Sequence, residues 1–167
     1  MWRSPPLLAP VIRVGMTGVF ALMRLRWFFT RPHTPGVQAV AFTPAGKVVL
    51  VRQTYTKQWM LPGGGVEAGE DGAAATIREL REEIGLSGWT SVDKLEEYDR
   101  IASHRRVHVE VFVVGGATYK PRWSLEIERI EDFAPEQLPA DCDAGAARMI
   151  GDAVKFISGT KSLLARA

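Results

Sequence analysis

Three glutamates occur at helix-neighbour spacing near the middle of the chain: Glu79, Glu82 and Glu83. At about 100° of rotation per residue, they fall within an arc of roughly 100° on one side of a helix. Like charges three or four residues apart repel one another and destabilise an isolated helix. A hard divalent cation such as Mg²⁺ or Mn²⁺ prefers oxygen ligands and would neutralise this group. The spacing therefore indicates a metal site, and the simpler alternative is an acidic helix face in solvent.

The elements around these glutamates favour a positioned site. A glycine-rich turn, Leu61–Gly65, leads into the acidic segment. Arg78 lies at the edge of the acidic arc and can orient one carboxylate, but one guanidinium does not balance three carboxylates. The opposite side of the same helix would be apolar, with Ala73, Ile77, Leu80 and Ile84. The pattern predicts a helix with one buried face and one charged face.

The fixed residues from Gly64 to Leu86 resemble the signature of the Nudix hydrolase family. Nine positions match in a stretch of twenty-three residues: Gly64, Glu70, Arg78-Glu79-Leu80, Glu82-Glu83 and Gly85-Leu86. The resemblance implies an α/β fold, an α/β/α sandwich with a mixed sheet. It also implies Mg²⁺-dependent hydrolysis of a nucleoside diphosphate linked to another moiety. By general layout it covers residues 37–139.

The resemblance further implies roles for individual residues. It assigns metal binding to Glu82, Glu83 and the carbonyl of Gly63. Glu79 would be a further ligand or the base that activates water, and Arg78 would hold Glu79 in place. Glu70 would support the loop and not bind the metal directly.

Other residues are candidates for contact with the substrate. Tyr55 and Trp59 precede the glycine-rich turn, where an aromatic ring could stack on a base. The alternative for Trp59 is a core residue that anchors the turn. Arginines suit phosphates through bidentate hydrogen bonds, although exposed loop arginines are usually only solvated. The predicted substrate contacts are Arg52, Tyr55, Trp59, Arg105 and Arg106.

A further carboxylate is expected from residues 125–133, a strand candidate. Nudix enzymes often add a carboxylate from this region to the metal site or as a base. Glu126 and Glu128 share one strand face, and the sequence does not choose between them.

The 167 residues carry a net charge of +2 and suit one domain, with no expected nucleic-acid partner. Cys142 is the only cysteine, which excludes an internal disulfide and favours a reducing, cytoplasmic compartment. We divide the chain into an apolar and basic helical extension, residues 1–33, and a Nudix domain, residues 34–167.

Residues 7–29 have apolar positions at helical spacing. Arg13 and Arg24 leave ten uncharged residues between them, whereas a membrane span needs about twenty. Two interpretations are open: this helix packs on the domain or on a second subunit of a homodimer, or it lies peripherally on an anionic membrane surface. Residues 31–36 contain two prolines and a glycine and are interpreted as a linker.

The rest of the domain is predicted to consist of alternating strands and loops that end in a helix. Residues 37–42 and 47–52 are predicted to pair as a hairpin. Residues 87–94 are polar and predicted to form a loop, followed by strands at 95–100 and 107–114. The predicted closing helix covers residues 144–158.

The substrate stays open between nucleoside triphosphates, dinucleoside polyphosphates, nucleotide sugars and a broad-range activity. One alternative, motivated by residues 7–29, is a membrane-associated hydrolase of a lipid or isoprenoid diphosphate. Another is a catalytically silent nucleotide-binding module. Its sign would be the loss of Glu79, Glu82 or Glu83, and all three are present.

Overall fold

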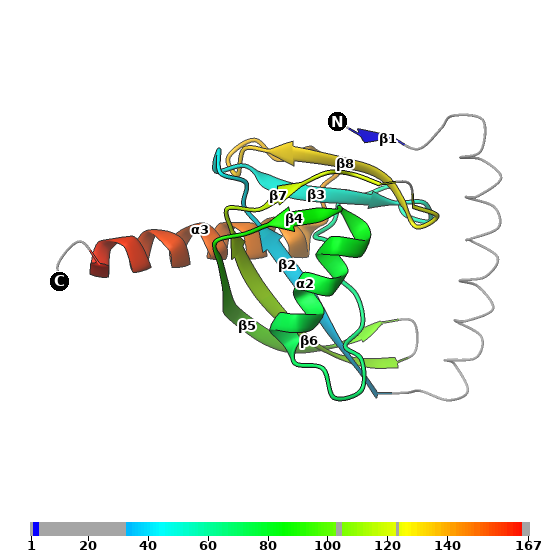
Figure 1. Cartoon of the computed structure of the whole chain (residues 1–167). Helices are drawn as coiled ribbons and strands as arrows, with labels where there is room; N and C mark the ends of the chain where they lie inside the picture. Colours follow the sequence, from blue (N-terminus) through cyan, green and yellow to red (C-terminus); the bar gives the residue numbers. More distant parts are fainter. Residues whose placement is uncertain (1, 4–32, 103–104, 123, 165–167) are drawn as a thin grey trace.

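The computed structural model describes residues 2–3, 33–102, 105–122 and 124–164. Two helices enclose a layer of strands, with α2 on one side and α3 on the other (Figure 1). No helix among these residues is long and apolar enough to cross a membrane. The helix predicted at residues 7–29 lies outside the described residues, so its proposed contacts with a membrane or a second subunit stay predictions.

The larger sheet is mixed and has the order β2-β6-β5. Strand β6 (Arg105–Gly115) lies in its centre, parallel to β2 (His33–Ala41) and antiparallel to β5 (Ser91–Ala102). A βαβ-type connection is needed between parallel neighbours, and α2 (Gly72–Glu83) lies within this connection.

A second, antiparallel sheet has the order β1-β8-β3. Its strands are β1 (Trp2–Arg3), β8 (Ile127–Phe133) and β3 (Val48–Gln53). A two-stranded sheet joins β4 (Leu86–Gly88) to β7 (Thr118–Tyr119) beside the end of α2 (Figure 1).

Strand β3 shows how the sandwich is held together. Its side chains alternate: Val48 and Leu50 belong to the core under α3 (Ala144–Leu164), whereas Val49 and Val51 belong to the core under α2. A strand that is buried on both faces has no polar face, which explains its continuous apolar run. The predicted α/β/α sandwich is confirmed.

The predicted hairpin of residues 37–42 and 47–52 is wrong in its pairing. The turn forms, because the amide of Gly46 donates to the carbonyl of Thr43 at 2.9 Å. After a single bridge between Phe42 and Val48, however, β2 continues in the mixed sheet and β3 in the antiparallel sheet. The sequence predicted the turn correctly, but β2 and β3 each form a longer strand pairing with a segment elsewhere in the chain.

Two predicted irregular segments are also wrong. Residues 87–94 contain the end of β4 and the start of β5, because Ser91–Ala102 follows β6 over its whole length. The predicted linker ends earlier than expected, since β2 begins at His33 and pairs there with Arg106. A parallel neighbour thus imposes strand geometry on a segment with Pro35 and Gly36. The division of the chain between residues 33 and 34 stays a prediction.

Replacement of Leu50 by alanine tests the two-sided core. Leu50 is fully buried, so the Leu50→Ala variant should lose about 2–5 kcal/mol of unfolding free energy, measured by urea denaturation. The matched control is Leu125→Ala, because Leu125 is 50% exposed and should lose less than about 1 kcal/mol. Equal losses in the two variants would contradict the assigned core.

Candidate functional site

Helix α2 is fixed at both ends. The Asp71 side chain caps its start by accepting a hydrogen bond from the amide of Ala74 at 2.8 Å. Gly85 follows its end with φ of 74°, a left-handed conformation that suits glycine. The predicted apolar face is buried at Ile77 and Leu80. These constraints fix which way the glutamates of the helix point.

The glycine-rich loop lies between β2 and α2, and its backbone touches both. The amide of Val37 donates to the carbonyl of Gly64 at 2.9 Å. A Cβ atom on Gly63 would lie under 3.0 Å from the backbone of Val37, and one on Gly64 would lie under 3.0 Å from the carboxylate of Glu79. The Gly63 position therefore requires glycine for close approach to the backbone, whereas a side chain at Gly64 would displace the Glu79 carboxylate.

Arg78 links the loop to the helix. Its Nε and one terminal nitrogen donate to the two carboxylate oxygens of Glu70, at 3.0 and 2.9 Å. The same guanidinium donates to the carbonyl of Gly65 at 2.7 Å and to Glu79 at 2.8 Å. Glu82 is further away, at 3.6 Å. The contacts expected of Arg78 and Glu70 are present, and their functional roles stay predictions.

Glu83 is buried, with 7% of its surface exposed. This corrects the expectation that all three glutamates form an open charged face. Its Oε2 accepts a hydrogen bond from the amide of Gly63 at 2.8 Å. Burial raises the pKa of Glu83 well above its usual value, and the negative charges of Glu126 and Glu79 raise it further. The amide of Gly63 opposes this shift, but it is too weak to cancel it.

Glu79 is half-buried between the loop and the neighbouring carboxylates. Burial raises its pKa, and the hydrogen bond from Arg78 limits the rise. Glu82 and Glu126 add to the rise through their negative charges. Glu82 itself is 61% exposed and marks the solvent side of the cluster.

The structure distinguishes the two candidates for a further carboxylate. The charge of Glu126 raises the pKa of both Glu79 and Glu83, which shows that it belongs to the cluster. The hydroxyl of Tyr55 donates to Glu126 at 2.6 Å. Ser124 also fixes this segment, because its hydroxyl oxygen accepts a hydrogen bond from the amide of Glu126 at 3.1 Å. The leading contributions to the raised pKa values of Glu79 and Glu83 include Glu126 and do not include Glu128. Glu126 lies just before β8, whereas Glu128 lies within it. The alternation of side chains along a strand therefore could not by itself show which of these two glutamates belongs to the cluster.

The donor chemistry of the carboxylate cluster suits a divalent cation, although among the described residues the acidic group whose ligand atoms lie within 4.8 Å of one another is that of Glu97, His108 and Glu110. Four carboxylates, those of Glu79, Glu82, Glu83 and Glu126, influence one another, and among the described residues Arg78 is the one cation bonded to them. The buried Glu83 accepts a backbone amide and no cationic side chain. Carboxylate oxygens are the ligands that Mg²⁺ and Mn²⁺ prefer. The amide of Gly63 donates a hydrogen bond to Glu83. The expectation that the carbonyl of Gly63 binds a metal stays a prediction.

The burial of Trp59 disfavours its predicted contact with substrate. The ring is 4% exposed and packs edge-on against Phe133, with the centroids 5.1 Å apart. Arg52 lies over the same ring at 4.8 Å and forms an ion pair with Asp141. Trp59 is thus the core anchor of the turn, and its burial counts against the prediction that it stacks on a base. Arg52 is already paired, which weakens its predicted role with phosphates.

The structure relates the remaining predicted substrate contacts, Tyr55, Arg105 and Arg106, to the carboxylate cluster in different ways. Tyr55 is part of it through Glu126. Arg106 is exposed at the first residues of β6, and the side chain of Arg105 lies outside the described residues. The structure therefore leaves the phosphate role of both arginines as a prediction.

A second polar group on β5 and β6 was not predicted as a site. Glu97, His108 and Glu110 have ligand atoms within 4.8 Å of one another. The ammonium of Lys94 donates to both Glu97 and Glu110 and so offsets part of their negative charge. These strands pair in register, which brings side chains together that are more than ten residues apart in sequence.

A model of the NUDIX domain matches residues 32–152 of this chain. The chain belongs to the Nudix family. The match contains the whole carboxylate cluster and every described strand except β1, so the family resemblance drawn from the glutamate spacing is confirmed. The role of each residue within this Nudix domain rests on the geometry described above.

Curated relatives of this Nudix protein are named RNA pyrophosphohydrolase. The protein from Acidiphilium cryptum is 36% identical over 88 residues, which is 50% of this chain and 48% of that protein. The protein from Caulobacter vibrioides is 37% identical over 86 residues, 44% of this chain and 50% of that protein. The match thus spans about half the length of each relative.

Solved structures share the fold. A MutT Nudix hydrolase from Burkholderia pseudomallei has a TM-score of 0.62 and 23% identity, covering 72% of this chain and 97% of that one. A UDP-X diphosphatase has a TM-score of 0.59 and 22% identity, covering 76% of this chain and 64% of that one. At these identities the likeness shows the fold alone.

Replacement of Gly64 by alanine tests the contact between loop and helix. The new methyl group would displace the Glu79 carboxylate, and we expect Mn²⁺ affinity to fall about tenfold in titration calorimetry, by about 1.4 kcal/mol. Gly65→Ala is the matched control, because a Cβ there meets no atom within 4 Å. A wild-type affinity in Gly64→Ala would contradict the assigned geometry.

The raised pKa values of Glu79 and Glu83 predict how pH affects the metal-free protein. Because the folded protein raises the pKa of these two carboxyls, folding favours their protonated form. Their contribution to stability is therefore fully present below the pKa of the unfolded chain. It is lost as the pH rises through the pKa of the folded protein. A bound cation favours the ionised form, so the increase in Tm with Mg²⁺ should be larger at pH 8 than at pH 5.5. Differential scanning fluorimetry measures this.

The Glu83→Gln variant is the control for this pH dependence, because the amide has no proton to lose. We expect its Tm to vary less with pH and to respond less to Mg²⁺. If Mg²⁺ raised the Tm of the wild-type protein equally at both pH values, the titration of these carboxyls would not control metal binding.

Proposed function

We propose that this Nudix protein is a divalent-metal-dependent pyrophosphohydrolase that acts on the 5′-polyphosphate end of RNA. The observation that carries the hydrolase proposal is the buried Glu83 within a cluster of four carboxylates and a single bonded arginine. Such an excess of negative charge is costly unless a cation offsets it.

The residues of the cluster would divide the work as follows. Glu82 and Glu83 would hold the metal, with Glu126 as the further carboxylate beside them. When bound, a divalent cation stabilises negative charge on phosphoryl oxygens and lowers the pKa of a bound water. Arg78 keeps Glu79 in a fixed orientation through its contacts with Glu70 and the loop.

Hydrolysis needs a proton acceptor beside the attacking water. A new bond forms between the water oxygen and phosphorus while the bridging phosphorus–oxygen bond breaks, and the leaving oxygen stays with the departing phosphate group. Glu79 would accept the proton of the water, because its burial-raised pKa brings it closer to neutral pH. Tyr55 would hold Glu126 through its hydroxyl group.

The RNA part of the proposal is supported by the relatives named RNA pyrophosphohydrolase, which match 50% and 44% of this chain. It departs from the composition-based expectation of no nucleic-acid partner. A nearly neutral protein can still act on one end of an RNA, since this needs a local site and no overall basic charge.

A substrate panel tests the proposal. Purified full-length protein with Mg²⁺ or Mn²⁺ would be offered a 5′-triphosphorylated RNA, a nucleoside triphosphate, a diadenosine polyphosphate and a nucleotide sugar. We expect release of phosphate or pyrophosphate from the RNA end, read by chromatography. Cleavage of another class without cleavage of RNA would overturn the substrate proposal and keep the hydrolase. No cleavage at all would favour the silent binding module.

Conversion of single glutamates to glutamine tests the assigned carboxylates. Glu83→Gln should lower kcat at least 100-fold, because the amide carries no charge for the metal, while the fold persists by circular dichroism. Glu126→Gln should lower kcat about tenfold or more. The matched control is Glu128→Gln, two residues along, which should stay within about twofold. Similar losses in Glu126→Gln and Glu128→Gln would contradict the choice of Glu126.

A further inference from the structure

An aromatic ring and an arginine lie together on the surface near the end of α2. Trp89 follows β4 and is 39% exposed. The guanidinium of Arg81 lies over its ring, 5.2 Å from the centroid. Arg81 precedes Glu82 on α2 but projects about 100° away from it, so this pair lies on the flank of the helix that faces away from Glu79 and Glu83. Single exposed apolar residues are common, and the neighbouring charges decide whether this one has a function.

Two further basic residues continue the same surface. The amide of Lys120 donates to the carbonyl of Gly85 at 3.0 Å, which holds the segment after β7 against the end of α2. Lys120 and Arg122 are both exposed there. We call Arg81, Trp89, Lys120 and Arg122 the basic strip. Within the part of the chain that the structure describes, no ion pair to an acidic residue involves its three cations.

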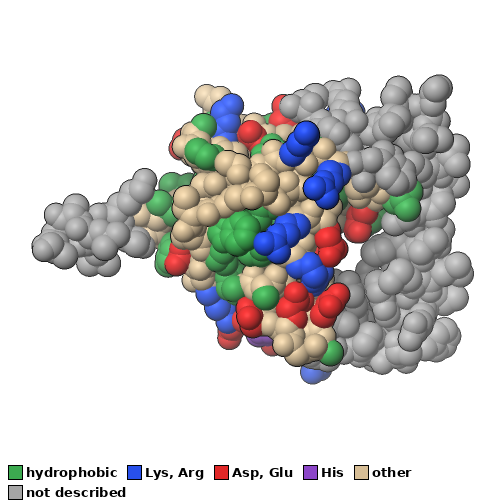
Figure 2. Space-filling model, in the orientation of Figure 1, with side chains coloured by type: hydrophobic (Ala, Val, Ile, Leu, Met, Phe, Trp, Pro, Cys, Tyr) green, Lys and Arg blue, Asp and Glu red, His purple; other side chains and the backbone are tan. Residues whose placement is uncertain are grey.

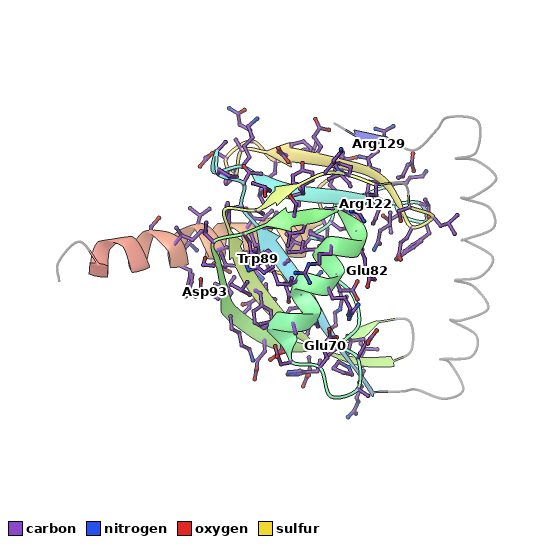
Figure 3. The ribbon with its side chains drawn as sticks, viewed as in Figure 1. Glu70, Glu82, Trp89, Asp93, Arg122 and Arg129 are labelled. Carbon is purple, nitrogen blue, oxygen red and sulfur yellow. The ribbon has the colours of Figure 1, made fainter. Side chains whose placement is uncertain are left out.

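The basic strip lies on the same face of the molecule as Glu82. In Figure 3, Arg122 and Trp89 lie on either side of the exposed end of α2, with Glu82 beside them. The space-filling view from the same side shows basic groups next to an apolar patch, with acidic groups adjacent (Figure 2). A ligand with its phosphate end at the carboxylate cluster would have to pass over the exposed surface of α2, past Glu82, to reach the basic strip.

We propose that the basic strip binds the single-stranded RNA chain that follows the 5′-terminal nucleotide of the substrate. The proposal rests on the function proposed above and adds how the body of the RNA is held. Trp89 provides a flat, exposed ring for stacking on an unpaired base. Arg81, Lys120 and Arg122 supply unpaired positive charge for the backbone phosphates.

The chemistry of the strip favours single-stranded RNA over other anionic partners. A duplex keeps its bases stacked inside and would not use the ring of Trp89. An anionic lipid surface or an acidic protein would use the charges but would not depend on the number of unpaired nucleotides. The dependence of binding on RNA length and on single-strandedness therefore distinguishes these partners.

The first experiment compares substrates of increasing length. Full-length protein with Mn²⁺ would hydrolyse 5′-triphosphorylated RNAs of one, two, four and eight nucleotides. For the wild-type protein, KM should fall with length. For Trp89→Ala, KM for the octamer should rise about tenfold, while kcat and the kinetics with the mononucleotide stay within about twofold.

Matched variants separate stacking from a structural role. Trp89→Phe keeps an aromatic ring and should restore most of the octamer affinity. Arg122→Ala should weaken binding of the octamer, whereas Lys47→Ala, in the turn between β2 and β3, should not. An equal loss with the mononucleotide and the octamer in Trp89→Ala would mean that Trp89 supports the domain, and the proposal would fail.

A binding experiment keeps this proposal separate from the proposed function. Fluorescence anisotropy would measure the Kd of a 5′-hydroxyl octamer, which cannot be hydrolysed, at several salt concentrations. Arg122→Ala should reduce the slope of log Kd against log salt by about 0.7, the contribution of one phosphate contact on a single strand.

The outcomes of the two experiments are distinct. If no RNA is hydrolysed but Trp89→Ala still weakens octamer binding, the proposed function fails and the basic strip stands. If RNA is hydrolysed with the same KM at every length, the proposed function stands and the strip proposal is wrong. If a double-stranded octamer or anionic vesicles bind as tightly as the single strand, the strip is a general anion surface, and the proposal is overturned.

Discussion

The burial of one carboxylate governs the geometry of this site. Glu83 lies inside the domain with its charge facing the amide of Gly63, and three other carboxylates act on it. A hydrogen bond from one neutral amide does not offset the cost of burying an ion. The surrounding residues therefore form a site whose negative charge a bound divalent cation would offset, which is the physical basis of the proposed metal dependence.

Arg78 determines how the remaining negative charge is arranged. Its guanidinium joins Glu70, Gly65 and Glu79, so that the loop and the helix cannot move independently. The planar fork of arginine suits this arrangement, because it donates in several fixed directions at once. The arginine is fully used in positioning, and within the part of the chain that the structure describes Glu83 and Glu126 have no hydrogen bond to a cationic side chain. Arg78 thus orients Glu79 and the loop, but it does not compensate the negative charge of Glu83 and Glu126.

The two sheets have unequal importance for the site. Strand β2 of the mixed sheet holds the glycine-rich loop, and the residues before β8 of the antiparallel sheet bring in Glu126. Figure 1 shows α2 crossing in front of both sheets, which explains how it meets residues from each. The basic strip uses a third region, where the segment after β7 is bonded to the end of α2.

The sequence by itself determined the parts that depend on local spacing: the helix, its apolar face, the glycine-rich turn and the family. The tertiary structure alone decided the pairing of β2 with β6 in place of β3, the burial of Glu83 and Trp59, and the choice of Glu126 over Glu128. The physical reason is distance along the chain. Helix periodicity involves residues a few positions apart, whereas strand partners and burial depend on segments tens of residues away, which leave no periodic signal in the sequence.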